Sequence, residues 1–157
     1  MKSIMFVCHG NICRSPMAEF ILKKMVADSR DAENYRIASC ATSTEEIYRG
    51  IGNPIYPPAR REMTARGVEF DPDKRAIQLC REDYEKYDLF VCMDSKNVRN
   101  AIMILGGDPD GKIKKLMDYT DRGGDVSDPW YSDRFDVAFD DIYEGCRALL
   151  RTLEDGE

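Results

Sequence analysis

The chain has 157 residues, a formal net charge of −6 and a single histidine. This length is typical of one domain with a buried hydrophobic core, so we predict a single domain over residues 1–157. The acidic balance argues against nucleic acid as a partner, because binding a polyanion needs a clustered basic face. The six cysteines lack the CxxC spacing of a zinc site, and neither a metal nor another cofactor is indicated.

Apolar runs in the sequence are too short to span a membrane, and no signal-peptide pattern is visible. We therefore expect no membrane association and a cytoplasmic protein whose thiols stay reduced. We expect the chain to be a monomer or to associate weakly with itself.

Residues 7–16, Val-Cys-His-Gly-Asn-Ile-Cys-Arg-Ser-Pro, are predicted to form a phosphate-binding loop. The apolar run at residues 4–7 is typical of a strand buried on both faces. Gly10 and Asn11 tolerate a positive φ, so the chain can curl there and point its N–H groups inward. Ser15 is predicted to cap a helix and Pro16 suits its first position. Apolar residues continue with helical spacing to Val26, and the helix is predicted to end near residues 28–30. A strand, a concave loop and a helix N-terminus together indicate an anion site.

Cys8 and Arg14 stand in a Cys-x5-Arg relation within this loop. The thiol can lie beneath a phosphoryl group while the guanidinium forks two of its oxygens. Inward N–H groups, the helix terminus and Arg14 favour the reactive thiolate, and the Ser15 hydroxyl can hydrogen-bond the sulfur and help it leave. The alternative is a buried Cys8 behind an ordinary glycine turn. The residues expected around the anion are His9, Gly10, Asn11, Ile12, Cys13, Arg14 and Ser15.

Residues 7–19 match throughout the motif Val-Cys-x-Gly-Asn-Ile-Cys-Arg-Ser-Pro-x-Ala-Glu. In this stretch the chain resembles the low-molecular-weight protein tyrosine phosphatases, and in particular a bacterial-type member. The resemblance extends over nearly the whole chain, through Ser39, the Met-Asp pair at 93–94 and the Asp-Pro-Trp-Tyr run at 128–131. It implies an α/β fold: a small doubly wound sheet of four parallel strands, with helices on both faces and the phosphate-binding loop after the first strand.

Two positions bear on how the loop is held in place. Ser39 lies at the end of a strand predicted over residues 35–40, and in the family a serine here hydrogen-bonds the loop asparagine, Asn11. A serine that satisfies a local turn is the alternative. Lys74 stands where many relatives carry a histidine that braces this asparagine, so the departure leaves the bracing network open.

Asp94 follows a strand predicted over residues 89–93. Ligands gather at the carboxyl ends of parallel strands, so Asp94 is expected close to Cys8. By the resemblance, its role is to orient Arg14 or to cap the helix predicted over residues 95–105, without taking part in proton transfer.

The segment at residues 42–58 is dense in glycine and proline and is predicted to be a long surface loop. Many family members have a tryptophan here that forms one wall of the active-site cleft. Ile47 or Tyr48 is the predicted substitute for that wall, with simple loop packing as the alternative. Farther along the chain we predict a helix at 59–66, a fourth strand at 114–117 and a closing amphipathic helix at 135–153.

Asp128 is the predicted acid, one of five aspartates in the polar segment at residues 118–133. A phosphatase needs such a group because the phenolate must be protonated as the thiolate attacks, and a water must be deprotonated afterwards. Trp130 and Tyr131 beside it can sandwich a flat phenyl ring, which favours phosphotyrosine over phosphoserine. A proline-stiffened turn with two partly buried aromatic rings is the alternative.

The leading prediction is a protein tyrosine phosphatase that hydrolyses phosphotyrosine in proteins through a phosphocysteine intermediate, with phosphate or other oxyanions as inhibitors. Three alternatives remain open. An arsenate reductase could use Cys92, but its relay needs a third cysteine, and none occurs between Cys92 and Cys146. A protein arginine phosphatase tends to have threonine in place of Ile12 and lacks the paired aromatic residues. A non-catalytic phosphotyrosine-binding module is disfavoured by Cys8 and Asp128.

Cys8 and Cys13 could also pair reversibly. Such a disulfide would block the nucleophile and make the enzyme sensitive to oxidation. The alternative is a Cys13 that merely packs under the loop.

Overall fold

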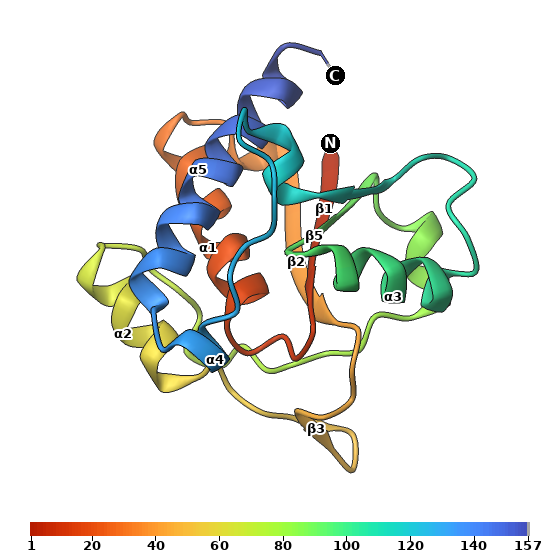
Figure 1. Cartoon of the computed structure of the whole chain (residues 1–157). Helices are drawn as coiled ribbons and strands as arrows, with labels where there is room; N and C mark the ends of the chain where they lie inside the picture. Colours follow the sequence, from red (N-terminus) through yellow and green to blue (C-terminus); the bar gives the residue numbers. More distant parts are fainter. Residues whose placement is uncertain (157) are drawn as a thin grey trace.

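A parallel sheet of four strands lies at the centre of the computed structural model, which describes residues 1–156 (Figure 1). The strands run in the order β2-β1-β5-β6, and each pair of neighbours is parallel. Their bounds are β1 Lys2–Cys8, β2 Tyr35–Ala41, β5 Leu89–Cys92 and β6 Ile113–Lys115. The apolar run at residues 4–7 is thus part of the central strand β1, whose register puts Val7 beside Cys40 and Cys92.

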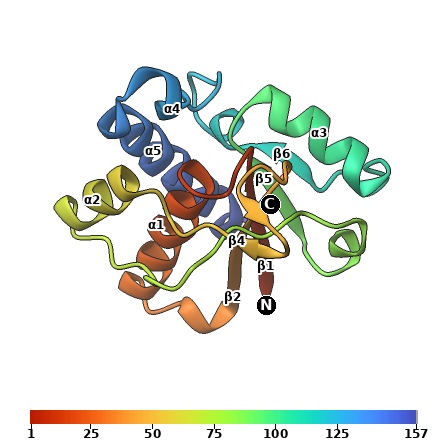
Figure 2. The same cartoon turned by 90° about the horizontal axis from the view of Figure 1, so that it is seen from below.

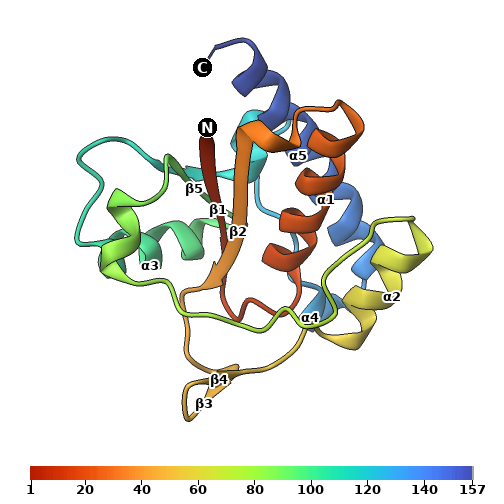
Figure 3. The ribbon, with the colours of Figure 1, turned by 180° about the vertical axis from the view of Figure 1, so that it is seen from behind.

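Helices cover both faces of this sheet (Figures 1 and 3). The three longest are α1 Arg14–Asp28, α3 Ser95–Leu105 and α5 Phe135–Glu154. Side chains of β1 alternate between two hydrophobic clusters: Ile4 and Phe6 pack on the side of α1 and α5, and Met5 and Val7 on the side of α3. The predicted doubly wound α/β fold with four parallel strands is therefore confirmed.

Shorter elements complete the chain: α2 Pro57–Ala65, α4 Pro129–Ser132, and the 3-10 helices η1 Ala32–Asn34, η2 Arg81–Glu85 and η3 Leu116–Tyr119. The helix α2 starts at Pro57, two residues before the predicted start at residue 59, because proline fits the first helical positions, where its missing N–H needs no partner. The fourth strand is also shorter than predicted, since Leu116 already belongs to η3. Among the described residues, no helix is both long enough and apolar enough to cross a membrane.

The segment at residues 42–58, predicted as a long surface loop, contains a small hairpin. Its strands, β3 Ile47–Tyr48 and β4 Ile51–Gly52, pair antiparallel. Arg49 and Gly50 between them have φ values of 52° and 81°, a left-handed pair that suits a two-residue hairpin turn. The sequence pattern concealed this turn because arginine seldom adopts a positive φ. The hairpin projects beyond the carboxyl ends of the sheet strands (Figures 2 and 3).

Candidate active site

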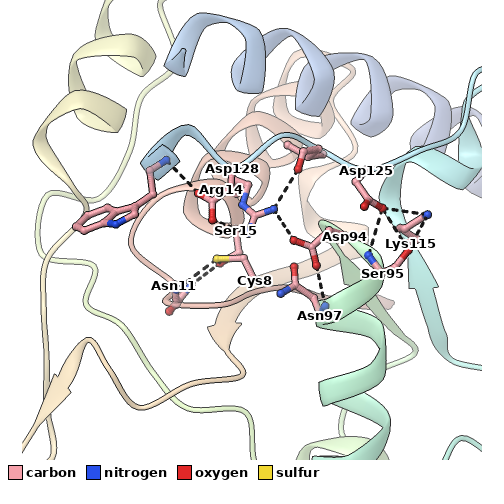
Figure 4. A network of polar contacts seen from close by, with 12 residues as sticks. Cys8, Asn11, Arg14, Ser15, Asp94, Ser95, Asn97, Lys115, Asp125 and Asp128 are labelled. Atoms are coloured by element: carbon pink, nitrogen blue, oxygen red, sulfur yellow. Dashed lines mark hydrogen bonds and ion pairs between the residues drawn. The ribbon is translucent and has the colours of Figure 1, made fainter. Parts of the chain in front are cut away.

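The loop between β1 and α1 curls around the thiol of Cys8, which lies at the end of β1 and is almost fully buried (Figure 4). Asn11 has a φ of 60°, as the sequence predicts for this position, and its backbone N–H donates to Cys8 Sγ at 3.3 Å. The Ser15 hydroxyl oxygen lies 3.0 Å from the same sulfur. The sulfur therefore faces two polar groups that can stabilise a negative charge on it.

The helix α1 begins at Arg14, one residue before the Ser-Pro pair, with Cys13 in the capping position. The predicted cap by Ser15 is wrong, because the Ser15 hydroxyl contacts Cys8 Sγ and accepts a hydrogen bond from Asn11 Nδ2 at 2.8 Å. The Ser15 hydroxyl thus contacts the Cys8 thiol and does not cap the helix.

Arg14 is 4% exposed, and its guanidinium is held from two sides. Nη1 donates to Asp94 Oδ2 at 2.9 Å and to the Val126 carbonyl oxygen at 3.1 Å, and Nη2 lies 3.6 Å from Asp128 Oδ2. Burial disfavours the charge on Arg14, but the negative charges of Cys8, Asp128 and Asp94 outweigh it and raise the pKa of the guanidinium. Arg14 is therefore a fixed cation beside the thiol.

Asp94 stands at the carboxyl end of β5, next to β1 in the sheet. One carboxylate oxygen pairs with Arg14, and the other accepts from the backbone N–H of Asn97 at 2.7 Å, which caps α3. The two roles that the sequence left as alternatives for Asp94 are thus both present. The same carboxylate links the start of α3 to the phosphate-binding loop.

The Asn11 side chain is 1% exposed and makes four hydrogen bonds. Its Nδ2 donates to Ser15 Oγ at 2.8 Å and to Ser39 Oγ at 2.9 Å. Its Oδ1 accepts from Lys74 Nζ and from the backbone N–H of Ile77, both at 3.0 Å. This carboxamide therefore ties the loop to β2 and to the segment around residue 75, and Ser39 lies where the resemblance implied.

Lys74 takes the place of the bracing histidine and completes the network. Its Nζ also donates to the backbone carbonyls of Ser39 and Arg75, at 3.2 and 3.1 Å. Burial lowers the pKa of Lys74, and the nearby charge of Glu19 opposes this shift. Glu19 is itself buried, accepting from Ser39 Oγ at 2.6 Å and pairing with Lys23 at 2.7 Å.

A cavity of about 270 Å³ opens above the thiol. Asp128 lies at its edge in the capping position of α4, where its Oδ1 accepts from the Trp130 backbone N–H at 3.0 Å. The lining combines the loop residues Cys8, His9, Gly10, Asn11, Ile12, Cys13 and Arg14 with Glu45, Glu46, Lys96, Asp128, Trp130 and Tyr131. A larger hollow of about 510 Å³ lies between α1 and residues 67–71, away from the thiol and Arg14.

The predicted wall from Ile47 or Tyr48 needs correction. Both residues belong to β3, and the Tyr48 side chain is 72% exposed on the projecting hairpin. Glu45 and Glu46 form the wall instead, and Glu46 packs so close to Gly10 that a Cβ there would lie 3.1 Å from its Cγ. Because the hairpin turn carries the apolar residues outward, the glutamates before it face the cavity.

Sequence reasoning missed three lining residues, Glu45, Glu46 and Lys96. The position of Lys96, two residues after Asp94 at the start of α3, could have been inferred from the argument that placed Asp94. The glutamates carried no such signal. Glu45 Oε2 also lies 2.8 Å from His9 Nε2, which joins the phosphate-binding loop to the hairpin segment.

A thiol, a fixed guanidinium and a carboxyl group converge on one small cavity at the carboxyl ends of β1 and β5 (Figure 4). The thiol can form a covalent bond, the guanidinium can bind an anion, and the carboxyl group can move a proton. The fold and the site together define a cysteine-dependent enzyme that acts on phosphoryl groups.

Comparison with known proteins gives the family. The sequence matches the family model described as low molecular weight phosphotyrosine protein phosphatase over residues 3–157. The rat protein of that name is 36% identical, over 95% of this chain and 94% of its own. The solved structure of YfkJ from Bacillus subtilis is 31% identical, with a TM-score of 0.92, and the match covers 100% of this chain and 97% of YfkJ.

A third similar structure is Wzb from Vibrio vulnificus, solved in complex with benzylphosphonate. It is 26% identical with a TM-score of 0.82, and the match covers 96% of this chain and 98% of Wzb. The chain belongs to the low-molecular-weight protein tyrosine phosphatases, which are hydrolases with a cysteine-based mechanism.

Proposed function

We propose that the chain hydrolyses phosphotyrosine in proteins, with Cys8 as the nucleophile, Arg14 as the phosphate-binding cation and Asp128 as the acid and base. The observation that carries this assignment is the Cys8 sulfur, which lies on the lining of the cavity, 3.0 Å from Ser15 Oγ, with Arg14 and Asp128 beside it. Inward N–H groups and the guanidinium bind the phosphoryl oxygens.

In the first step the Cys8 thiolate attacks phosphorus, so that an S–P bond forms and the P–O bond to the phenol breaks. Asp128 donates its proton to the departing phenolate oxygen. Arg14 binds two equatorial oxygens, and its pairing with Asp94 keeps its plane fixed while charge shifts toward the leaving group.

In the second step a water attacks the phosphocysteine. The Asp128 carboxylate takes a proton from that water, the P–O bond forms, and the S–P bond breaks to release phosphate and the thiolate. The Ser15 hydroxyl, 3.0 Å from the sulfur, can donate a hydrogen bond to the departing thiolate. One carboxyl group thus serves both half-reactions and returns to its starting form.

An aryl ester as substrate is supported by Trp130 and Tyr131, which line the cavity beside Asp128. Two aromatic rings at the mouth of a phosphate site can hold a phenyl ring between them. The name of the rat relative and the benzylphosphonate complex of Wzb support the same substrate class. Phosphate, vanadate and other oxyanions should occupy the loop as inhibitors.

We further infer a single domain over residues 1–157, a cytoplasmic location, and a monomer or weakly associating chain. The shared central strand β1, whose side chains enter both hydrophobic clusters, supports one domain. Six free cysteines support a reducing compartment.

The test is turnover of three phosphorylated substrates by the purified chain: an aryl phosphate, a phosphotyrosyl peptide and a phosphoarginyl peptide. We expect hydrolysis of the first two, without added metal and with loss of activity in Cys8→Ser. Faster turnover of phosphoarginine than of phosphotyrosine would overturn the substrate assignment. Thioredoxin-coupled reduction of arsenate should be absent, because Cys92 is fully buried and burial raises the pKa of its thiol.

A further inference from the structure

Tyr56, the residue before α2, packs its ring against the segment that carries Asp128. The ring centroid lies 5.2 Å from that of Trp130, with 46° between the planes, and 6.0 Å from that of Phe135, at 37°. Trp130 follows Asp128 by two residues, and Phe135 is the first residue of α5. The ring of Tyr56 therefore packs against α4 itself and against the start of α5, and α4 lies beside the start of α2 (Figure 3).

The backbone of Tyr56 contacts the other half of the site. Its N–H donates to the carbonyl oxygen of Ile12 in the phosphate-binding loop at 2.8 Å. One residue thus touches the loop through its main chain and the Asp128 segment through its ring.

The upstream side of Asp128 is held by other groups. Val126 donates its backbone N–H to Met93 O at 2.9 Å, and its carbonyl oxygen accepts from Arg14. Downstream, α4 is a single turn that ends at Ser132, and the following residue, Asp133, has a φ of 57°. Such a short turn has little stability of its own, so packing of its side chains decides where it lies.

We propose that Tyr56 is a positioning residue for Asp128: its ring holds Trp130 and Phe135 so that the carboxyl group stays within reach of the leaving oxygen. This inference rests on the proposed role of Asp128 as the acid. Proton transfer requires a heavy-atom separation of about 2.6 to 3.2 Å, so a small displacement of the segment costs rate. Binding of the phosphoryl group depends on the loop and is separate from this ring contact.

The experiment compares kcat/KM on two substrates, phenyl phosphate and dinitrophenyl phosphate. The phenolate is a poor leaving group that needs the acid, whereas the dinitrophenolate leaves without a proton. Tyr56→Leu removes the ring and keeps the backbone N–H. We expect about a 10- to 100-fold loss on phenyl phosphate and less than about a two-fold loss on dinitrophenyl phosphate. Tyr56→Phe, which keeps the ring, should restore the wild-type ratio.

Tyr143→Leu is the matched control. This substitution also removes a contact between two aromatic rings, since the ring centroid of Tyr143 lies 6.3 Å from that of Phe139 on α5. It should change neither substrate's kcat/KM. If circular dichroism shows that Tyr56→Leu does not fold, Tyr56→Met is compared on the same two substrates instead, because methionine fills the space with a flexible apolar side chain.

An equal loss on both substrates, or no loss on either, would overturn the proposal. Asp128→Asn separates this failure from a failure of the proposed function. If Asp128→Asn shows the selective loss on phenyl phosphate and Tyr56→Leu does not, only the role of Tyr56 is refuted. If Asp128→Asn shows no selective loss, the acid itself is misassigned.

Discussion

The Lys74 ammonium lies 3.0 Å from Oδ1 of Asn11, the residue whose left-handed backbone shapes the phosphate-binding loop. The other end of the same carboxamide donates to Ser15 Oγ, which contacts Cys8 Sγ. The Lys74 cation at one end of this chain of hydrogen bonds polarises it toward the sulfur at the other end. Lys74 is thus connected to the Cys8 sulfur without touching it.

Replacement of Lys74 should weaken this connection. We expect Lys74→Met to lower kcat/KM about 10-fold, because a hydrogen bond from a charged donor is lost, and we expect Lys74→His to recover most of the activity. Steady-state rates on an aryl phosphate measure the effect. Wild-type kcat/KM for Lys74→Met would show that the backbone N–H of Ile77 braces Asn11 sufficiently on its own.

The same residue predicts a pH effect. Burial lowers the pKa of Lys74, so its ammonium gives up the proton at a lower pH than an exposed lysine would. The wild-type pH profile of kcat/KM should therefore fall on the alkaline side, and Lys74→Met, which has no such proton, should lack that fall. If kcat/KM of the wild type and of Lys74→Met falls identically at alkaline pH, the fall comes from a group other than Lys74.

Cys8→Ser should abolish turnover while keeping affinity for a phosphotyrosyl peptide within about 10-fold, because the loop N–H groups and Arg14 still bind the phosphoryl oxygens. Isothermal titration calorimetry measures the affinity. In the wild type, vanadate should inhibit competitively and EDTA should leave the rate unchanged. Residual turnover in Cys8→Ser above that of a Cys8→Ala control would argue for a nucleophile other than sulfur.

Asp128→Asn should lower kcat by roughly 10² to 10⁴, because the proton for the leaving phenolate is lost. The matched control is Asp121→Asn, an exposed aspartate of the same polar segment, which should have the wild-type rate. A normal rate of Asp128→Asn on phenyl phosphate would refute the assignment and direct attention to Asp118, Asp125 and Asp133.

Oxidation should act through Cys8 and Cys13. Burial raises the pKa of Cys13, so this thiol is protonated and peroxide reacts first at Cys8 to form a sulfenic acid. Condensation with the Cys13 thiol releases water and forms a disulfide that an added thiol can reduce. We expect thiol to rescue the wild type after peroxide treatment but not Cys13→Ser. Equal inactivation rates, with rescue in neither protein, would exclude this switch.

Asp108 provides a test of stability away from the site. Its carboxylate accepts from Tyr84 OH at 2.7 Å and from the backbone N–H groups of Lys112 and Ile113 at 2.7 and 3.1 Å. Burial opposes the charge, but these hydrogen bonds outweigh it and lower the pKa of Asp108. The stabilisation is therefore present at neutral pH and lost as the pH falls through the pKa of the folded state.

We expect Asp108→Asn to lower the free energy of unfolding by about 1 to 3 kcal/mol at pH 7, with kcat/KM unchanged. Urea unfolding at neutral and acidic pH measures both proteins. The difference in the free energy of unfolding between the wild type and Asp108→Asn should shrink as the pH falls. A difference that stays constant with pH would mean that the charge of Asp108 does not stabilise the fold.

The loop between β1 and α1 could be predicted from the sequence because it depends on local preferences, whereas the fold of four parallel strands was implied by the resemblance to the family. Gly10 and Asn11 allow the curl, and the apolar run at residues 4–7 is buried on both faces of a parallel sheet. The carboxyl end of a strand next to β1 also located Asp94 correctly, since strand direction alone brings it to that edge.

Other parts of the site arise from contacts between distant segments. Lys74 is 63 residues from Asn11, and Tyr56 is 74 residues from Trp130; both pairs meet only when the chain has closed around the sheet. The wall of Glu45 and Glu46 depends on a turn at Arg49 that propensity does not indicate.

The sequence by itself thus indicated a candidate nucleophile, a candidate anion site and most of the strands and helices, because backbone preference and hydrophobic period act over a few neighbouring residues. Only the tertiary structure decided which side chains brace Asn11 and which ring restrains the Asp128 segment. Such contacts are set by how packed layers bring remote residues together, and no local pattern of residues records that arrangement.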